Sequence, residues 1–119
     1  MTGPSWRVRL SAAAERDFSD ILAWTAQRFG DPQAAAYEAL LTEAVAALIA
    51  GPGAHGVTGR SDIGPDLYTL HVRRKGRPGR HLILFRAKGG TAAPAIEVLR
   101  ILHDAMDLGR HVPSPEAER

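Results

Sequence analysis

The feature that most constrains this fold is a pair of short apolar segments towards the C-terminal end of the chain. His81–Arg86 contains four consecutive apolar residues, and Ile96–Leu102 is apolar except for Glu97 and Arg100. Apolar side chains occupy both alternating positions in each segment, so neither face of the predicted strands can be fully exposed to water. The two segments therefore predict strands near the middle of a sheet, which the rest of the chain must cover.

A helical hairpin is predicted to supply this cover. Ser11 is a good N-cap, and apolar residues recur at helical spacing along Ala12–Phe29. Gly30 ends this helix, Asp31-Pro32 opens a second one with Asp as its N-cap, and Gly51-Pro52 ends the second. Because only Gly30 and the cap separate the two helices, we expect them to be antiparallel neighbours.

The remaining segments complete an α+β domain with the order β-α-α-β-β-β and a short C-terminal helix. Trp6–Leu10 and Asp66–Arg73 alternate in the manner of strands, whereas residues 51–65 are rich in Gly and Pro and predict a loop. Arg74–Gly79 predicts a basic hairpin tip, and His103–Gly109 a turn or short helix. The helix hairpin should pack on one face of a mainly antiparallel sheet, leaving Arg and His side chains on the other face.

The size of the chain predicts one domain. Its 119 residues suffice for a single core, which we place at residues 6–111, with flexible termini at 1–5 and 112–119. The absence of Cys excludes disulfides and thiolate metal sites. No signal-peptide layout is present, and no apolar run is expected to reach the roughly 20 residues of a membrane span. These features predict a cytoplasmic protein that does not enter the membrane.

Positive charge is concentrated in one part of the chain. Residues 60–90 hold eight Lys or Arg and two Asp or Glu, a balance of +6, whereas residues 1–59 and 91–119 each have a balance of −2. A basic patch of this kind suits an anionic partner, either nucleic acid or an acidic protein surface. The alternative is a solvated hairpin tip, in which charged side chains are ordinary.

Few kinds of chemistry are supported by motifs. The chain has neither GxxxxGK[ST] nor GxGxxG, its serines lie outside GxSxG, and its five His make neither HxxxH nor HExxH. We therefore expect no cofactor and no metal site.

One set of arginines with a histidine remains as a candidate for chemistry. Arg73, Arg80, Arg86, Arg100 and His103 lie on or at the ends of predicted strands. Such a set can hold a phosphodiester and stabilise charge during RNA cleavage. Cleavage also needs both an acid and a base, and the sequence offers no clear partner for His103. The alternative is structural: His103 hydrogen-bonds to the backbone, and Arg86 and Arg100 pair with nearby acids of the C-terminal segment, namely Glu97, Asp104 or Asp107.

Three segments carry a family resemblance. They are LSAAAERDFSDILAWTAQRFG with the helix that follows it, GRHLILFR, and IEVLRILHDAMD, in which Arg100, His103, Met106 and Asp107 stand at the expected places. Taken together, from about Trp6 to His111, they resemble the ParE toxins of bacterial type II toxin–antitoxin systems, within the RelE/ParE superfamily. The resemblance implies a fold like the one predicted above.

The resemblance also implies two alternative functions. ParE toxins poison DNA gyrase and are neutralised by a ParD-like antitoxin from a neighbouring gene, in a toxin–antitoxin hetero-oligomer. RelE relatives cut mRNA in the ribosomal A site, usually with a C-terminal Tyr. Here His103 takes that place, and Tyr37 and Tyr68 lie elsewhere. This departure favours the gyrase hypothesis and leaves ribosome-dependent cleavage as the alternative, with His103, Arg86 and Arg100 as catalytic candidates. A third hypothesis is a degenerate toxin-like domain that serves only as an antitoxin-binding or DNA-regulatory partner.

Two sets of candidate binding residues follow. The candidates for target binding are Arg73, Arg74, Arg80, Arg86 and Arg100. The candidates for antitoxin binding are Phe18, Trp24, Tyr37 and Leu41. Trp24 lies at the edge of the apolar stripe of its helix, so it either closes the core or sits on a partner surface.

Overall fold

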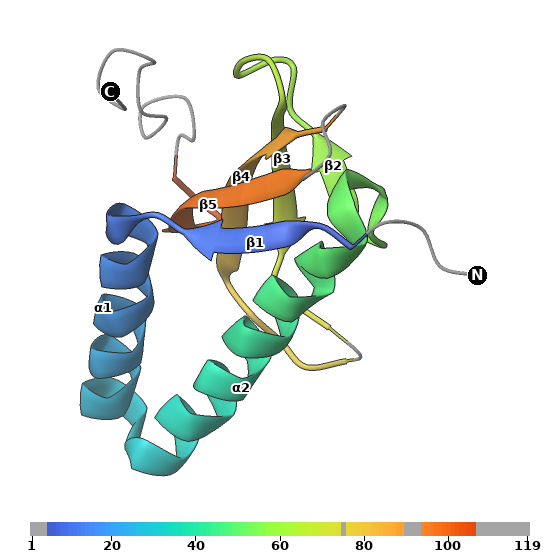
Figure 1. Ribbon diagram of the computed structural model, residues 1–119. Helices are drawn as coiled ribbons and strands as arrows, with labels where there is room; N and C mark the ends of the chain where they lie inside the picture. Colours follow the sequence, from blue (N-terminus) through green and yellow to red (C-terminus); the bar gives the residue numbers. More distant parts are fainter. Residues whose placement is uncertain (1–4, 75, 90–93, 107–119) are drawn as a thin grey trace.

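The computed structural model describes residues 5–74, 76–89 and 94–106, and the termini that we expected to be flexible lie almost wholly outside these ranges. The described elements are β1 (Arg7–Leu10), α1 (Ala12–Phe29), α2 (Asp31–Ala47), the 3₁₀ helix η1 (Leu48–Gly53), β2 (Val57–Gly59), β3 (Leu67–His71), β4 (His81–Lys88) and β5 (Ala95–His103). They form an α+β fold in which a helix hairpin packs on a five-stranded sheet (Figure 1). The predicted fold class is thus confirmed.

The sheet has the order β1-β5-β4-β3-β2. Strand β1 runs parallel to β5, and the other neighbouring pairs are antiparallel. The two apolar segments that predicted central strands are β5 and β4, which lie between β1 and β3. Figure 1 shows the closed end of the helix hairpin projecting beyond the sheet.

Three local predictions differ from the structure. Residues 51–65 were expected to be a loop, but Val57–Gly59 pairs with β3 as a short edge strand. Asp31 is the first residue of α2 rather than its cap, because Gly30 with φ 96° ends α1 and is also the N-cap of α2. The turn or short helix expected at His103–Gly109 lies partly outside the described residues. Its described part contains a turn, as one alternative had it, but His103 is the last residue of β5.

The main core lies between the helices and one face of the sheet. Phe85 is fully buried there, against side chains from both helices and from the neighbouring strands. The helix residues of this core are Ala14, Leu40, Leu41, Ala44 and Leu48, and the strand residues are Leu70, Val72, Ile83, Phe85, Ala87, Ile96, Val98 and Ile101. Burying one side chain of this size contributes roughly 1.5–3 kcal/mol.

Helix α2 is more apolar than the sequence analysis expected. The segment Asp31–Gly53 is long and apolar enough to cross a membrane, by length and composition alone. In this fold its leucines pack on the sheet instead, and 28% of its most apolar 18-residue stretch is buried. Core helices of soluble proteins share this composition, so the segment is weak evidence for membrane insertion.

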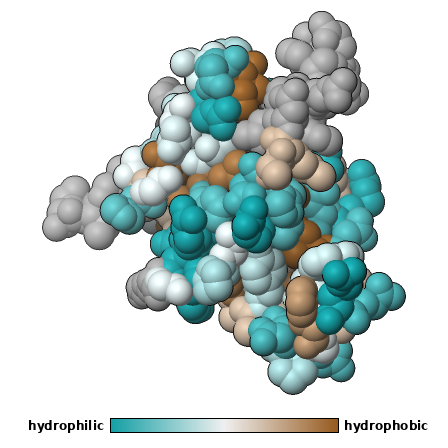
Figure 2. Space-filling view, turned by 180° about the vertical axis from the view of Figure 1, so that it is seen from behind, coloured by the Kyte–Doolittle hydropathy of each residue, from teal (hydrophilic) through white to brown (hydrophobic). Residues whose placement is uncertain are grey.

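The sheet face turned away from the helices is mixed rather than simply polar. It carries Arg86, Arg100 and His71, as expected, but also the buried Leu84 and Leu102, which their registers place on the same face. Viewed from behind (Figure 2), hydrophilic residues cover much of the surface and the apolar areas between them are small.

Candidate functional site

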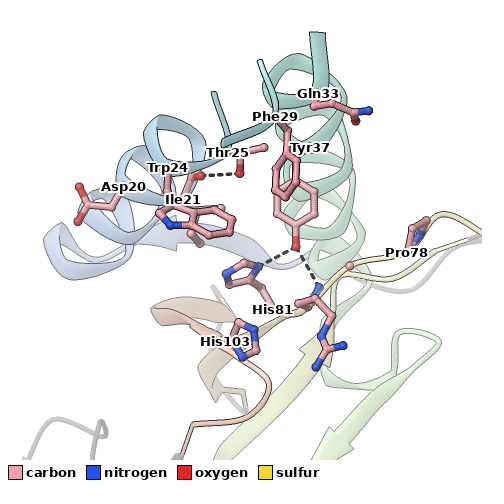
Figure 3. Close-up of a pocket in the computed structure, with 12 residues that line it drawn as sticks. Asp20, Ile21, Trp24, Thr25, Phe29, Gln33, Tyr37, Pro78, His81 and His103 are labelled. Carbon is pink, nitrogen blue, oxygen red and sulfur yellow. Dashed lines mark hydrogen bonds between the residues drawn. The ribbon is translucent and has the colours of Figure 1, made fainter. Parts of the chain in front are cut away.

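An apolar groove of about 770 Å³ separates the helix hairpin from the ends of β4 and β5. Helices α1 and α2 form one wall, and the hairpin between β3 and β4 forms the other (Figure 3). The residues that line it are Asp20, Ile21, Trp24, Thr25, Phe29, Gln33, Tyr37, Pro78, Gly79, Arg80, His81 and His103. We refer to this site as the hairpin groove.

Exposed aromatic side chains form the helix wall of the hairpin groove. Trp24 is 53% exposed and Phe29 is 61% exposed. Their rings meet edge to face, with centroids 5.9 Å apart and an interplanar angle of 73°. The Arg28 guanidinium lies 5.4 Å from the centre of the Trp24 ring. Because Trp24 is more than half exposed, it is a surface residue and does not close the core. Large apolar groups exposed beside a concavity are typical of protein-binding surfaces.

Tyr37 joins the two walls of the groove. Its hydroxyl accepts a hydrogen bond from the backbone N–H of Arg80 at 3.1 Å and lies 2.7 Å from Nδ1 of His81. Since the hydroxyl has one proton to donate, the pair is satisfied when Tyr37 donates to a neutral His81. Figure 3 shows both contacts meeting at the tyrosine oxygen.

Burial shapes the ionisation of this pair. Burial, together with a smaller effect of the neighbouring His103, lowers the pKa of His81 to about 4, and burial raises the pKa of Tyr37. His81 is therefore neutral at pH 7. The rings of His81 and His103 have centroids 5.6 Å apart, so two imidazoles do meet at the floor of the groove. An imidazole with a pKa near 4 is a weak base at neutral pH.

Asp104 organises the charged groups beyond the groove floor. Its carboxylate lies 3.0 Å from Nε2 of His71 and 3.5 Å from Nε of Arg80. The hydrogen bond with His71, helped by Arg80, holds the pKa of Asp104 below its usual value. Nδ1 of His103 accepts a hydrogen bond from the Ala105 backbone N–H at 3.1 Å. The hydrogen bond between His103 and the backbone, which the structural alternative predicted, is thus observed.

The five arginines proposed for target binding do not share one surface. Arg73, Arg74 and Arg80 belong to the hairpin that connects β3 and β4. Arg86 and Arg100 lie in β4 and β5, on the sheet face turned away from the helices. Of these five arginines, Arg80 is the one that lines the hairpin groove.

Arg100 is held by an acidic partner on α1. Its Nε and Nη2 donate to Asp17 at 2.7 and 3.0 Å, and this hydrogen bond raises the pKa of Arg100. The sequence analysis looked for partners among nearby acids of the C-terminal segment and missed Asp17. No local pattern distinguishes Asp17 from the other charged residues of the helix.

The four residues proposed for antitoxin binding fall into two groups. Trp24 and Tyr37 line the hairpin groove. Phe18 is partly buried against the core, and Leu41 is fully buried within it. Leu41 is therefore a core residue, whereas Phe29 is an exposed groove residue that the sequence analysis overlooked.

A helix hairpin on a five-stranded mixed sheet, with an exposed aromatic groove, defines the structural class of this protein. Residues 8–108 match the family model described as "ParE toxin of type II toxin-antitoxin system, parDE". The chain therefore belongs to the ParE toxin family. A solved structure titled "Chromosomal ParDE TA system from P. aeruginosa" has the same fold, with a TM-score of 0.64 at 23% identity, over 85% of this chain and 98% of that chain. No curated protein matches the chain significantly.

Proposed function

We propose that this protein is a toxin that acts by binding and inhibiting DNA gyrase, and that a ParD-like antitoxin neutralises it in a hetero-oligomer. Membership of the ParE family supports the toxin role. The proposed target implies action in the cytoplasm. The observation that favours binding over cleavage is the separation of the candidate catalytic side chains.

That separation follows from the strand registers. His103 pairs with His81 on the sheet face that carries Ile83 and Ile101, which pack against the helices. Arg86 and Arg100 lie on the other face, opposite Glu97 and Leu84 respectively. Arg100 is also engaged by Asp17. An acid, a base and a charge stabiliser must surround one phosphodiester, and these three residues do not.

One observation supports ribosome-dependent mRNA cleavage as a second candidate. His81 lies beside His103, so the structure brings together a second imidazole that the sequence analysis did not find. A histidine pair can supply both an acid and a base. The lowered pKa of His81 and its bond to Tyr37 weigh against this role at neutral pH.

The hairpin groove is the surface that we assign to the antitoxin. Its aromatic wall suits an apolar segment carrying Leu or aromatic anchors. Arg80, whose side chain is 72% exposed, and the exposed Arg28 lie at its margins, so acidic residues beside those anchors would complement it. Such a segment would fold as it binds.

A gyrase assay tests the proposed function directly. Purified protein should inhibit supercoiling and cause cleaved DNA to accumulate, and the antitoxin from the neighbouring gene should reverse both effects. A parallel assay measures mRNA cleavage on programmed ribosomes. Cleavage that is lost in His103→Ala, with gyrase unaffected at micromolar protein, would replace the gyrase hypothesis with the ribonuclease one.

A further inference from the structure

Four basic side chains form a regular array on the sheet face turned away from the helices. In one row across the sheet, Arg7 of β1 and Lys88 of β4 flank Ala95 of β5. In the next row, Arg9 and Arg86 flank Glu97 in the same way. The sequence analysis placed Arg86 in a basic patch of the β3–β4 region, but it did not associate that patch with Arg7 and Arg9, which lie almost 80 residues away in the chain. We call Arg7, Arg9, Arg86 and Lys88 the basic square.

The spacing of the basic square follows from sheet geometry. Residues two apart on one strand are separated by about 6.6 Å, and strands on either side of a shared neighbour by roughly 10 Å. Arg7, Arg9 and Lys88 are exposed, and Arg86 is half-buried. A second groove, of about 930 Å³, runs along these residues.

The charge of this surface is strongly positive. Glu97 is the one acidic residue among the described residues that line the second groove, and it forms an ion pair with Arg9. The first turn of α1, at Ala12 and Ala13, lines the same groove. First-turn amides lack intrahelical acceptors and carry partial positive charge, so they reinforce the potential of the four cations.

The surroundings of the square favour a polyanionic backbone as its ligand. Phosphates repeat along a nucleic acid as regularly as these cations repeat along the strands. Among the described residues that line the groove, none is aromatic, so it offers no platform for stacking unpaired bases. The apolar anchors that a protein partner would use lie instead in the hairpin groove.

We propose that the basic square binds the sugar–phosphate backbone of duplex DNA without reading its sequence. The ligand class is a phosphodiester polyanion, held by Arg7, Arg9, Arg86 and Lys88. This inference goes beyond the proposed inhibition of gyrase and does not depend on it, because the DNA contact is measured in the absence of any other protein.

Fluorescence anisotropy with a labelled 20-base-pair duplex tests the proposal on the full 119-residue chain. Neutralisation of three or four phosphates predicts a slope of log affinity against log salt of about −3 to −4. Arg7→Ala with Lys88→Ala should weaken binding at least about tenfold at low salt and reduce the slope by about 2. Arg16→Ala with Arg77→Ala removes the same charge from exposed positions outside the square and should leave both quantities almost unchanged.

Three outcomes would overturn the proposal. One is the absence of salt-dependent binding by the wild-type chain at 50 mM salt. Another is equal weakening in the control pair, which would mean that net charge alone attracts DNA. The third is stronger binding to poly-glutamate than to the duplex at equal anion concentration, which would indicate an acidic protein partner. Circular dichroism of both double variants confirms that each is folded.

Discussion

Asp17 of α1 bonds to Arg100 of β5 and also accepts the backbone N–H of Ile101, at 2.9 Å. Strand β1 pairs with β5 only as far as Val98, so the rest of that strand edge would otherwise lack partners. Ser11 acts in the same way, because its hydroxyl donates to the carbonyl of Leu99 at 2.9 Å. Side chains of α1 thus continue the edge pairing that β1 begins, which protects the strand from pairing with another chain.

Asp17→Asn is expected to destabilise the fold by about 2–3 kcal/mol. The substitution removes a charge-assisted pair in which Asp17 is 15% exposed and Arg100 is 28% exposed. Urea unfolding followed by circular dichroism measures the loss. Asp20→Asn, an exposed change on the same helix, is the control. Equal unfolding midpoints for the two variants would show that the Asp17 contact contributes little.

Several elements could be predicted from the sequence because their signals are local. The apolar runs of β4 and β5 require burial on both faces, and the structure places them inside the sheet. Ser11 and Gly30 marked the ends of α1, and the structure confirms both, with the Ser11 hydroxyl accepting from the Ala14 N–H at 3.0 Å. Each of these signals acts within one turn or one strand.

Other features could not be predicted because they join distant segments. Strand β2 has only three residues and owes its conformation to pairing with β3. The contact between Tyr37 and His81 spans 44 positions, and that between Asp17 and Arg100 spans 83. The hairpin groove and the basic square likewise bring together segments that are distant in the chain. Charge counted along the chain therefore did not reveal the basic square.

Trp24→Ala and Phe29→Ala should each weaken antitoxin binding by about 30-fold or more. Exposed aromatic side chains beside a groove are typical binding hot spots, where truncation costs about 2 kcal/mol or more. Because both residues are more than half exposed, the stability of the free toxin should change little. Isothermal titration calorimetry measures the affinity, and Ile49→Ala, another exposed apolar residue, is the control.

Leu41→Ala should lower the stability of the toxin without weakening antitoxin binding. Leu41 is fully buried, so the substitution should reduce the free energy of unfolding by about 2–5 kcal/mol. Binding by the fraction that remains folded should persist. Antitoxin affinity that survives in Trp24→Ala and Phe29→Ala would contradict the assignment of the hairpin groove.

Stability should fall in acid because of His81. Its folded-state pKa of about 4 lies below the value of 6.5 expected in the unfolded chain. The unfolded state therefore takes up the proton first, so the His81 contribution is complete above pH 6.5 and is lost progressively as the pH falls towards 4. Asp104, whose pKa is also lowered, contributes stability that is lost only below its ordinary value of 3.8.

Urea midpoints at pH 7.5, 6.0 and 5.0 measure this dependence. His81→Gln removes the titrating group, so its midpoint should change less with pH over this range than that of the wild type. His55→Gln is the matched control, because His55 lies in the loop before β2, away from the groove. Parallel pH profiles for wild type and His81→Gln would contradict the assignment of the pH-dependent stability to His81.

Gly51→Ala should destabilise the protein far more than Gly53→Ala. Gly51 has φ 83°, and a methyl group there would overlap the indole of Trp6, whereas nothing lies within 4 Å of the corresponding position at Gly53. The strained backbone and the displaced ring together should cost about 2 kcal/mol or more. Urea unfolding compares the two variants.

Gly51→Ala and Gly53→Ala should also differ in tryptophan emission and in DNA binding by the basic square. The backbone N–H of Trp6 donates to the carbonyl of Ile49 at 3.0 Å, so the contact with Gly51 helps to anchor the start of β1, which carries Arg7 and Arg9. Gly51→Ala should therefore shift the tryptophan emission and, if the square binds DNA, weaken that binding as well. Gly53→Ala should do neither. Equal stability and emission in the two variants would show that β1 does not depend on the packing of Trp6 against Gly51.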